Sequence, residues 1–156
     1  MNKAPLILLH GWPGNEKNLD LAQALRAHGW NVLFFHYRGA WGSEGAYSFT
    51  HVVEDVAAAT DYVRANAARL RSDPNRIVLV GHSMGGFAAL MGAANDERIQ
   101  CTAAIAPADL GAIAGLFEAQ PQIAREWSSY ADTLGMLRGS SGKAMLDEIA
   151  GRRQDF

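Results

Sequence analysis

Apolar residues gather in four short runs, and longer stretches with helical periodicity separate these runs. The runs are Leu6–His10, Val32–Phe35, Ile77–Val80 and a fourth within Ile99–Ala106. Within them the apolar residues are continuous rather than alternating, which is typical of strands that are covered on both faces of a parallel sheet. Strands that alternate with helices through short loops predict right-handed crossovers. We therefore expect an α/β fold with three layers, α/β/α, around a mostly parallel sheet.

The stretches between the runs predict helices. The first helix has an N-cap candidate in Asn15 and a C-terminal stop in Gly29. The second carries apolar residues three and four positions apart, which form one stripe on a helix: Val52, Val56, Ala59, Val63 and Ala67. A third helix is expected over Phe87–Ala94.

After Pro107 the pattern changes, and residues 108–156 contain no convincing strand. They predict short helices that are interrupted at four glycines and one proline, namely Gly111, Gly115, Pro121, Gly135 and Gly139. A chain of 156 residues is long enough for one domain and short for two. We expect a single domain with a core over residues 1–107 and a helical cap-like segment over 108–156.

Composition narrows the functional classes. The chain is 49% hydrophobic and carries a net charge of −2, so no basic surface for nucleic acid or for an anionic membrane is expected. A single cysteine, Cys101, permits neither an internal disulfide nor a cysteine metal cluster, and we expect it to be a small buried hydrophobe. No metal-ligand spacing such as H-E-x-x-H occurs, so neither a metal nor another cofactor is expected. Without a leader or membrane-spanning run, the simplest location is the cytoplasm.

Candidate chemistry begins at Gly81-His82-Ser83-Met84-Gly85, which fits the pattern G-x-S-x-G. An expected strand ends directly before the motif, and an expected helix follows it. A reversal this tight places its central residue in a strained conformation and needs small residues on either side. The Ser83 hydroxyl would then stand clear of the sheet as a nucleophile, and the Met84 N–H at the helix N-terminus would face a developing oxyanion.

A second motif, His10-Gly11-Trp12-Pro13-Gly14, follows the first expected strand. A loop in this position can direct one backbone N–H at the same oxyanion. Trp12 is the candidate for that donor, because Pro13 has no N–H. Trp12 and Met84 would together form a two-donor oxyanion hole.

The two motifs, with the R-G-rich loop Arg38–Gly45 between them, resemble the α/β-hydrolase superfamily over residues 4–107. The resemblance is strongest to bacterial serine hydrolases related to esterases and acyl-peptidases. It implies that the Val32 strand lies beside the Leu6 strand, with the Ile77 and Ile99 strands continuing the sheet on the other side. It also implies hydrolysis of a small-molecule carboxylic ester, or else an amide or thioester, through an acyl-enzyme on Ser83.

The chain departs from the superfamily pattern in one respect. The acid and then the histidine of the catalytic triad normally follow the nucleophile, yet all five histidines precede or adjoin Ser83. His82 and His10 fit structural roles better than that of a base. His36 ends the second strand at the catalytic edge, but its strand is not expected beside the strand of the nucleophile. Asp109 fits a helix N-cap better than a triad acid.

The last expected strand would leave an apolar, unpaired sheet edge. Cap helices, a second copy of the chain in a homodimer, or later strands of a longer protein would cover it, and we favour the last. The missing histidine keeps a second function open, that of a non-catalytic hydrolase-fold fragment or binding module.

Overall fold

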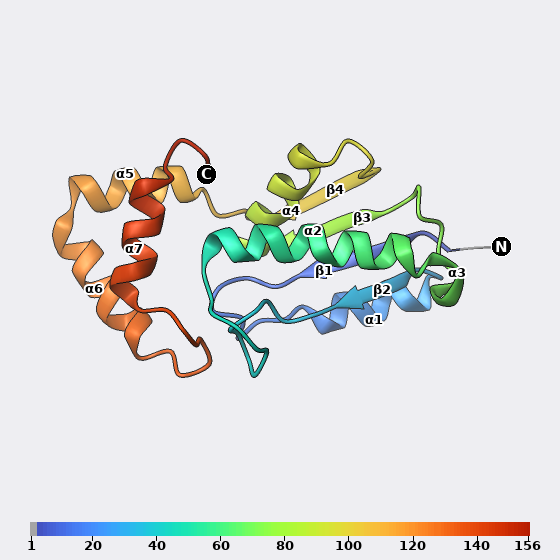
Figure 1. Ribbon diagram of the computed structural model, residues 1–156, viewed down its shortest axis with the longest axis horizontal. Coiled ribbons are helices and arrows are strands. Elements are labelled where there is room, and N and C mark those ends of the chain that lie inside the picture. Colours follow the sequence, from blue (N-terminus) through green and yellow to red (C-terminus); the bar gives the residue numbers. More distant parts are fainter. Residues whose placement is uncertain (1–2) are drawn as a thin grey trace. The chain divides into compact units, whose positions relative to one another are not determined.

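Four strands form one all-parallel sheet in the computed structural model, which describes residues 3–156 (Figure 1). They are β1 (Pro5–Leu9), β2 (Asn31–Phe34), β3 (Val78–His82) and β4 (Cys101–Ile105), in the order β2-β1-β3-β4. Leu6 of β1 pairs with Val32 on one side and with Val78 on the other. The expected α/β class and the expected neighbours of each strand are confirmed.

Helices cover both faces of this sheet. Helix α1 (Leu19–Ala27) packs its apolar residues against a cluster of Leu6, Leu8 and Val80 on one face. Helices α2 (Phe49–Ala65) and α4 (Met84–Asn95) meet at the other face, since a Cβ added at Gly92 of α4 would lie 2.8 Å from Val56 Cγ1 and 2.9 Å from Leu79 Cδ1. Leu79 and Val80 point to opposite faces because side chains alternate along a strand. The expected three layers are therefore present, and a short helix α3 (Ala67–Leu70) follows α2.

The N-terminus of α1 differs from the expectation. The helix begins at Leu19, and Asn18 rather than Asn15 precedes it as the N-cap residue, in the left-handed region with φ 53°. The Asn18 N–H donates to Glu16 Oε1 at 2.7 Å, so these residues form a turn before the helix. The sequence pattern around this helix did not distinguish Asn15 from Asn18 as the N-cap.

Burial differs sharply between the central and edge strands. All five residues of β1 are buried, and full burial of a large aliphatic side chain contributes about 1.5–3 kcal/mol. In β4 the residues Cys101, Ala103 and Ile105 are exposed, so the expectation of a buried Cys101 is wrong. These three residues share a face with Val80, but they lie one strand beyond the cluster that α1 contacts.

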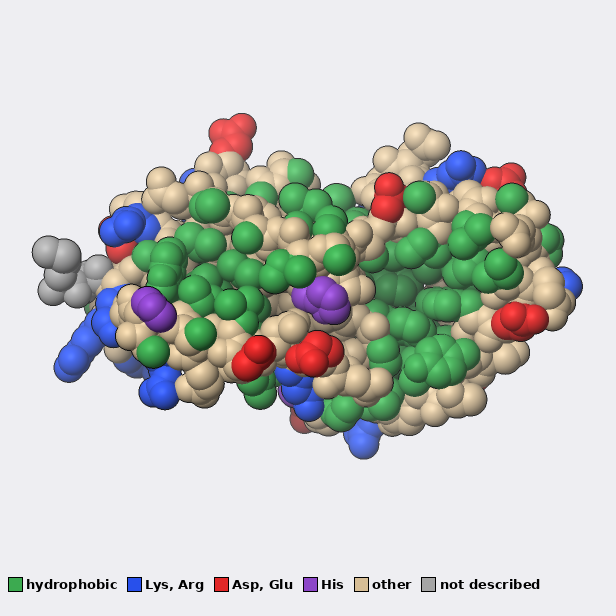
Figure 2. All heavy atoms as spheres, turned by 180° about the vertical axis from the view of Figure 1, so that it is seen from behind, with side chains coloured by type: hydrophobic (Ala, Val, Ile, Leu, Met, Phe, Trp, Pro, Cys, Tyr) green, Lys and Arg blue, Asp and Glu red, His purple; other side chains and the backbone are tan. Residues whose placement is uncertain are grey.

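The described residues divide into two compact units. The core unit comprises the residues up to Phe35 together with Val53–Ala108, and the helical unit comprises His36–Val52 with Asp109–Phe156. Helices α5 (Leu110–Ala119), α6 (Pro121–Asp132) and α7 (Gly142–Gly151) belong to the helical unit, on whose visible face hydrophobic side chains gather (Figure 2).

The expected helix breaks in this unit are partly wrong. Gly111 and Gly115 lie inside α5, whereas Pro121 begins α6 as a residue of its first turn. Glycine lowers helix propensity by only about 1 kcal/mol, which packing can override, whereas proline is well suited to a first turn. Gly135 and Gly139 lie between α6 and α7 as expected.

One carboxylate ties the two segments of the helical unit together. The Glu148 oxygens of α7 accept hydrogen bonds from the N–H groups of Phe49 (2.9 Å) and Thr50 (2.7 Å), and Ser48 Oγ accepts from the His51 N–H at 3.0 Å. The first turn of α2 is thus capped by a residue almost 100 positions away. Nearby, burial raises the pKa of Tyr47 well above its ordinary value, and the adjacent Tyr37 and Glu148 add to the effect.

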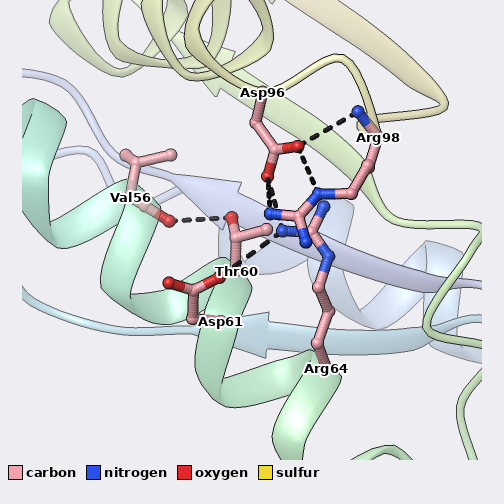
Figure 3. Close-up of polar contacts among 6 residues, drawn as sticks. All are labelled: Val56, Thr60, Asp61, Arg64, Asp96 and Arg98. Atoms are coloured by element: carbon pink, nitrogen blue, oxygen red, sulfur yellow. Dashed lines mark hydrogen bonds and ion pairs between the residues drawn. The ribbon is translucent and has the colours of Figure 1, made fainter.

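An ion-pair cluster joins the C-terminal ends of α2 and α4 (Figure 3). Asp96 accepts from Arg98 Nε at 2.9 Å and from Arg64 Nη1 at 2.5 Å. The hydrogen bonds from Arg98 and Arg64 hold the pKa of Asp96 well below its ordinary value, although partial burial opposes them. The Arg64 side chain is only 14% exposed, and its Nη1 also lies 3.5 Å from Asp61 Oδ1.

Candidate active site

Ser83 forms a sharp junction between β3 and α4. The strand ends at His82, the helix begins at Met84, and Ser83 has φ 56° and ψ −123°. Residues other than glycine rarely adopt this conformation, and holding one there costs of the order of 1–3 kcal/mol. The sequence placed Ser83 at a strained strand-to-helix turn, and the backbone has that form.

Backbone hydrogen bonds hold Ser83 in this conformation from both sides. The Ser83 N–H donates to Ile105 O at 2.9 Å, and the Ser83 carbonyl accepts from Phe87 N at 3.1 Å and from Ala108 N at 3.0 Å. The segment that follows β4 and the helix α4 therefore both fix the strand-to-helix turn at Ser83, called the elbow below. Sequence analysis did not find this role for Ile105 and Ala108, because no local pattern marks a backbone bond to a residue more than 20 positions away.

The two glycines of the motif are required by close backbone contacts. A Cβ added at Gly81 would lie 2.0 Å from Gly85 O, and one added at Gly85 would lie 2.2 Å from Leu9 O. Real Cβ atoms do not approach backbone atoms this closely, so only glycine fits at either position. The spacing G-x-S-x-G thus lets the turn close and lets α4 begin directly against the end of β1.

The loop after β1 lies against the same serine. A Cβ added at Gly11 would lie 3.2 Å from Ser83 Cβ and 3.6 Å from Ser83 Oγ. His10, which precedes it, is buried, and its Nδ1 lies 2.8 Å from Gly11 O. The structure therefore brings the two sequence motifs together around one hydroxyl.

This arrangement suits negative charge. The first N–H groups of a helix have no partner within the helix, and in α4 the first intrahelical bond is donated by Phe87. The N–H of Met84 thus belongs to the positive end of the helix, immediately after Ser83. Trp12 follows Gly11 in the loop that lies against Ser83. Both residues that the sequence predicted as oxyanion donors are in the two segments that meet at Ser83.

The histidines have mainly local contacts. Nδ1 of His28 lies 2.8 Å from Ala24 O, and Nδ1 of His51 lies 2.7 Å from Ala46 O, so both cap or brace nearby backbone. The ring of His36 stacks on Trp41 within the helical unit, and His36 lies beyond β2, which ends at Phe34 rather than at the expected His36. His82 is partly buried, and its Nδ1 has no hydrogen-bond partner among the described residues.

Three further findings concern Asp109, groups of metal ligands and membrane-spanning helices. Asp109 is the N-cap of α5, because its Oδ1 accepts from Ala112 N at 2.7 Å, which confirms the predicted cap. Over residues 3–156 no group of three or more potential metal ligands is found. In the same part of the chain, no helix combines the length and the hydrophobicity that crossing a bilayer requires.

The family follows from comparison with known proteins. A sequence profile described as the alpha/beta hydrolase family matches residues 6–155. The chain belongs to the alpha/beta hydrolase family. This hydrolase-family chain is 38% identical over 84 residues to an uncharacterized protein, YfhR, of Salmonella typhimurium, which covers 53% of the chain and 28% of the relative. It is 36% identical over 100 residues to the quorum-quenching protein AidA of Acinetobacter baumannii, a match that covers 60% of this chain and 32% of AidA.

Solved structures show the same fold. The Pyrococcus furiosus esterase Pf2001 matches with a TM-score of 0.58 and 28% identity, over 71% of this hydrolase-family chain and 46% of the esterase. Esterase 2 of Thermogutta terrifontis matches with a TM-score of 0.55 and 20% identity, over 68% and 46%. The chain thus spans less than a third of the length of the curated relatives and less than half of these esterases.

Proposed function

We propose that this chain carries the nucleophile of a serine hydrolase that cleaves a carboxylic ester through an acyl-enzyme on Ser83. One observation carries the proposal. Ser83 has a strained backbone at the junction of a buried strand and a helix N-terminus, and the Gly11 loop lies against its hydroxyl. Strain of this kind concentrates at functional sites, where surrounding contacts maintain it.

The reaction uses these groups in order. Ser83 Oγ adds to the ester carbonyl carbon while a general base takes the hydroxyl proton, which gives a tetrahedral oxyanion. The N–H groups of Trp12 and Met84 donate to that oxyanion, and loss of one such donor costs about 10²–10³ in rate. The carbon–oxygen bond to the alcohol then breaks, and water releases the acid from the acyl-enzyme.

An ester is the preferred substrate class for a chemical reason. An alkoxide leaves more readily than an amine, so an ester needs less help from a general acid. The 28% identity to a Pyrococcus furiosus esterase supports the same class. The substrate is a small molecule, and the proposal involves no cofactor, nucleic acid or membrane. We place the enzyme in the cytoplasm.

Turnover of paired substrates tests the proposal. The chain is assayed with p-nitrophenyl acetate and with p-nitroacetanilide, beside Ser83→Ala and a matched serine variant, Ser43→Ala. Ser43 donates to His36 O and belongs to the helical unit. We expect hydrolysis of the ester in preference to the anilide, abolished by Ser83→Ala and retained by Ser43→Ala.

Equal hydrolysis by the Ser83→Ala variant would contradict the proposal. So would an inert wild-type chain, a result that favours a non-catalytic binding module with a hydrolase fold. That second function is kept because His28 and His51 bind nearby backbone carbonyls and the His36 ring stacks on Trp41, so none of these three faces Ser83 as a base in the contacts described.

A further inference from the structure

The buried His10 contacts the loop that bears the Trp12 N–H. We propose that His10 is a positioning residue, whose imidazole sets the direction of that N–H toward the oxyanion. The inference rests on the proposed function, in which Trp12 donates to the oxyanion, and it adds a residue that does not itself touch the substrate.

The contact of His10 with a carbonyl oxygen identifies which ring nitrogen donates. His10 is 1% exposed and directly follows β1, and its Nδ1 lies 2.8 Å from Gly11 O. A carbonyl oxygen can only accept, so Nδ1 carries the proton and donates. The ring also packs against Phe34 of β2 with a centroid distance of 5.8 Å, which limits its rotation.

The His10 Nδ1 donor binds the carbonyl of the peptide unit that joins Gly11 to Trp12. The Gly11–Trp12 peptide bond is trans. In a trans peptide the carbonyl and the N–H point in opposite directions within one plane. Because the imidazole holds Gly11 O on its own side, the Trp12 N–H is directed away from His10.

The rest of the loop is fixed to the elbow by packing. Gly11 lies against Ser83, and a Cβ added at Gly85 would lie 2.6 Å from His10 O. These contacts fix the positions of residues 10 and 11, but a glycine leaves the rotation of the next peptide free. The bond from His10 Nδ1 removes that freedom. Loop, elbow and helix N-terminus can therefore present the Trp12 and Met84 donors to one point.

Two amide variants separate donor position from simple packing. In His10→Asn the amide nitrogen can occupy the place of Nδ1, whereas in His10→Gln it falls near the place of Nε2. The matched control is His28→Gln, because His28 makes the same bond to a carbonyl at 2.8 Å but is exposed at the end of α1. Each protein is reacted with an alkyl fluorophosphonate and assayed with p-nitrophenyl acetate, and its fold is checked by circular dichroism.

We expect His10→Gln to react at least about tenfold more slowly with the fluorophosphonate, since misdirection costs part of what deletion of a donor costs. For the ester, kcat should fall with KM unchanged, because the oxyanion forms in the transition state and the tetrahedral intermediate and is absent from the bound ester. His10→Asn should recover most of the rate, and His28→Gln should match the wild type. If His10→Gln does not fold, His10→Leu replaces it in the same comparison.

The outcomes distinguish the two proposals. A reactive wild type with equal rates for all His10 variants would overturn the positioning role alone. Equal losses in His10→Asn and His10→Gln would overturn it as well, because packing alone would then explain the effect. A wild-type chain that forms no adduct would overturn the proposed function, and this inference with it.

Discussion

The strained backbone of Ser83 has a measurable effect on stability. With φ 56° and ψ −123°, Ser83 is held where a Cβ costs about 1–3 kcal/mol. Ser83→Ala keeps the Cβ and the strain, whereas Ser83→Gly removes both. Glycine also raises the entropy of the unfolded chain, which lowers stability by about 0.4–1 kcal/mol. The difference should leave Ser83→Gly more stable than Ser83→Ala by about 1 kcal/mol.

Urea or thermal denaturation measures this difference. For a chain of this size, about 1 kcal/mol corresponds to a rise in Tm of roughly 2–4 °C. The control is Ala58→Gly at an exposed position inside α2, where the same change should lower stability by about 1 kcal/mol. If glycine lowered stability at position 83 as it does at position 58, the inference that Ser83 is strained would be refuted.

Three other substitutions test contacts within the core unit or within the helical unit. Gly85→Ala places a methyl group against the β1 backbone and should lower the free energy of unfolding by about 3 kcal/mol, whereas Gly135→Ala, with no atom within 4 Å, should have little effect in the same urea titration. Asp96→Asn removes the negative charge that two guanidinium groups contact. The pKa of Asp96 is lowered in the folded chain, so the stability that its carboxylate contributes is complete above the unfolded pKa of about 4 and is lost as pH falls. The wild type and the variant should therefore converge in free energy of unfolding on acidification. A difference that stays constant with pH would contradict the ion pairs. Glu148→Ala should cost about 2 kcal/mol by thermal melting because two N–H groups of α2 lose their acceptor, and Asp147→Ala, an exposed neighbour, should change stability by less than about 0.5 kcal/mol.

Much of the core unit could be predicted because its signals are local. A continuous apolar run marks β1, and a G-x-S-x-G turn between a strand and a helix marks Ser83. The sheet order followed from the resemblance to the hydrolase superfamily, and it agrees with the order found. The Asp109 cap was also readable, since an N-cap bonds within three residues.

The remaining features depend on contacts between distant positions. Cys101 looks like a core residue in sequence, but its exposure depends on which strand lacks a second neighbour. The grouping of His36–Val52 with the C-terminal helices rests on contacts between distant positions, among them the bonds to Glu148 and the backbone bond from Tyr47 N to Arg138 O. The bond from Ala108 to the Ser83 carbonyl is likewise set by the end of β4 rather than by any motif.

The most direct test of Ser83 as an activated nucleophile is an intact-mass measurement after treatment with a fluorophosphonate, followed by mapping of the modified peptide. We predict one phosphonyl adduct per chain, located on Ser83 and absent in Ser83→Ala. An adduct on another residue, or an unmodified wild-type chain under conditions that label known serine hydrolases, would contradict the assignment of Ser83.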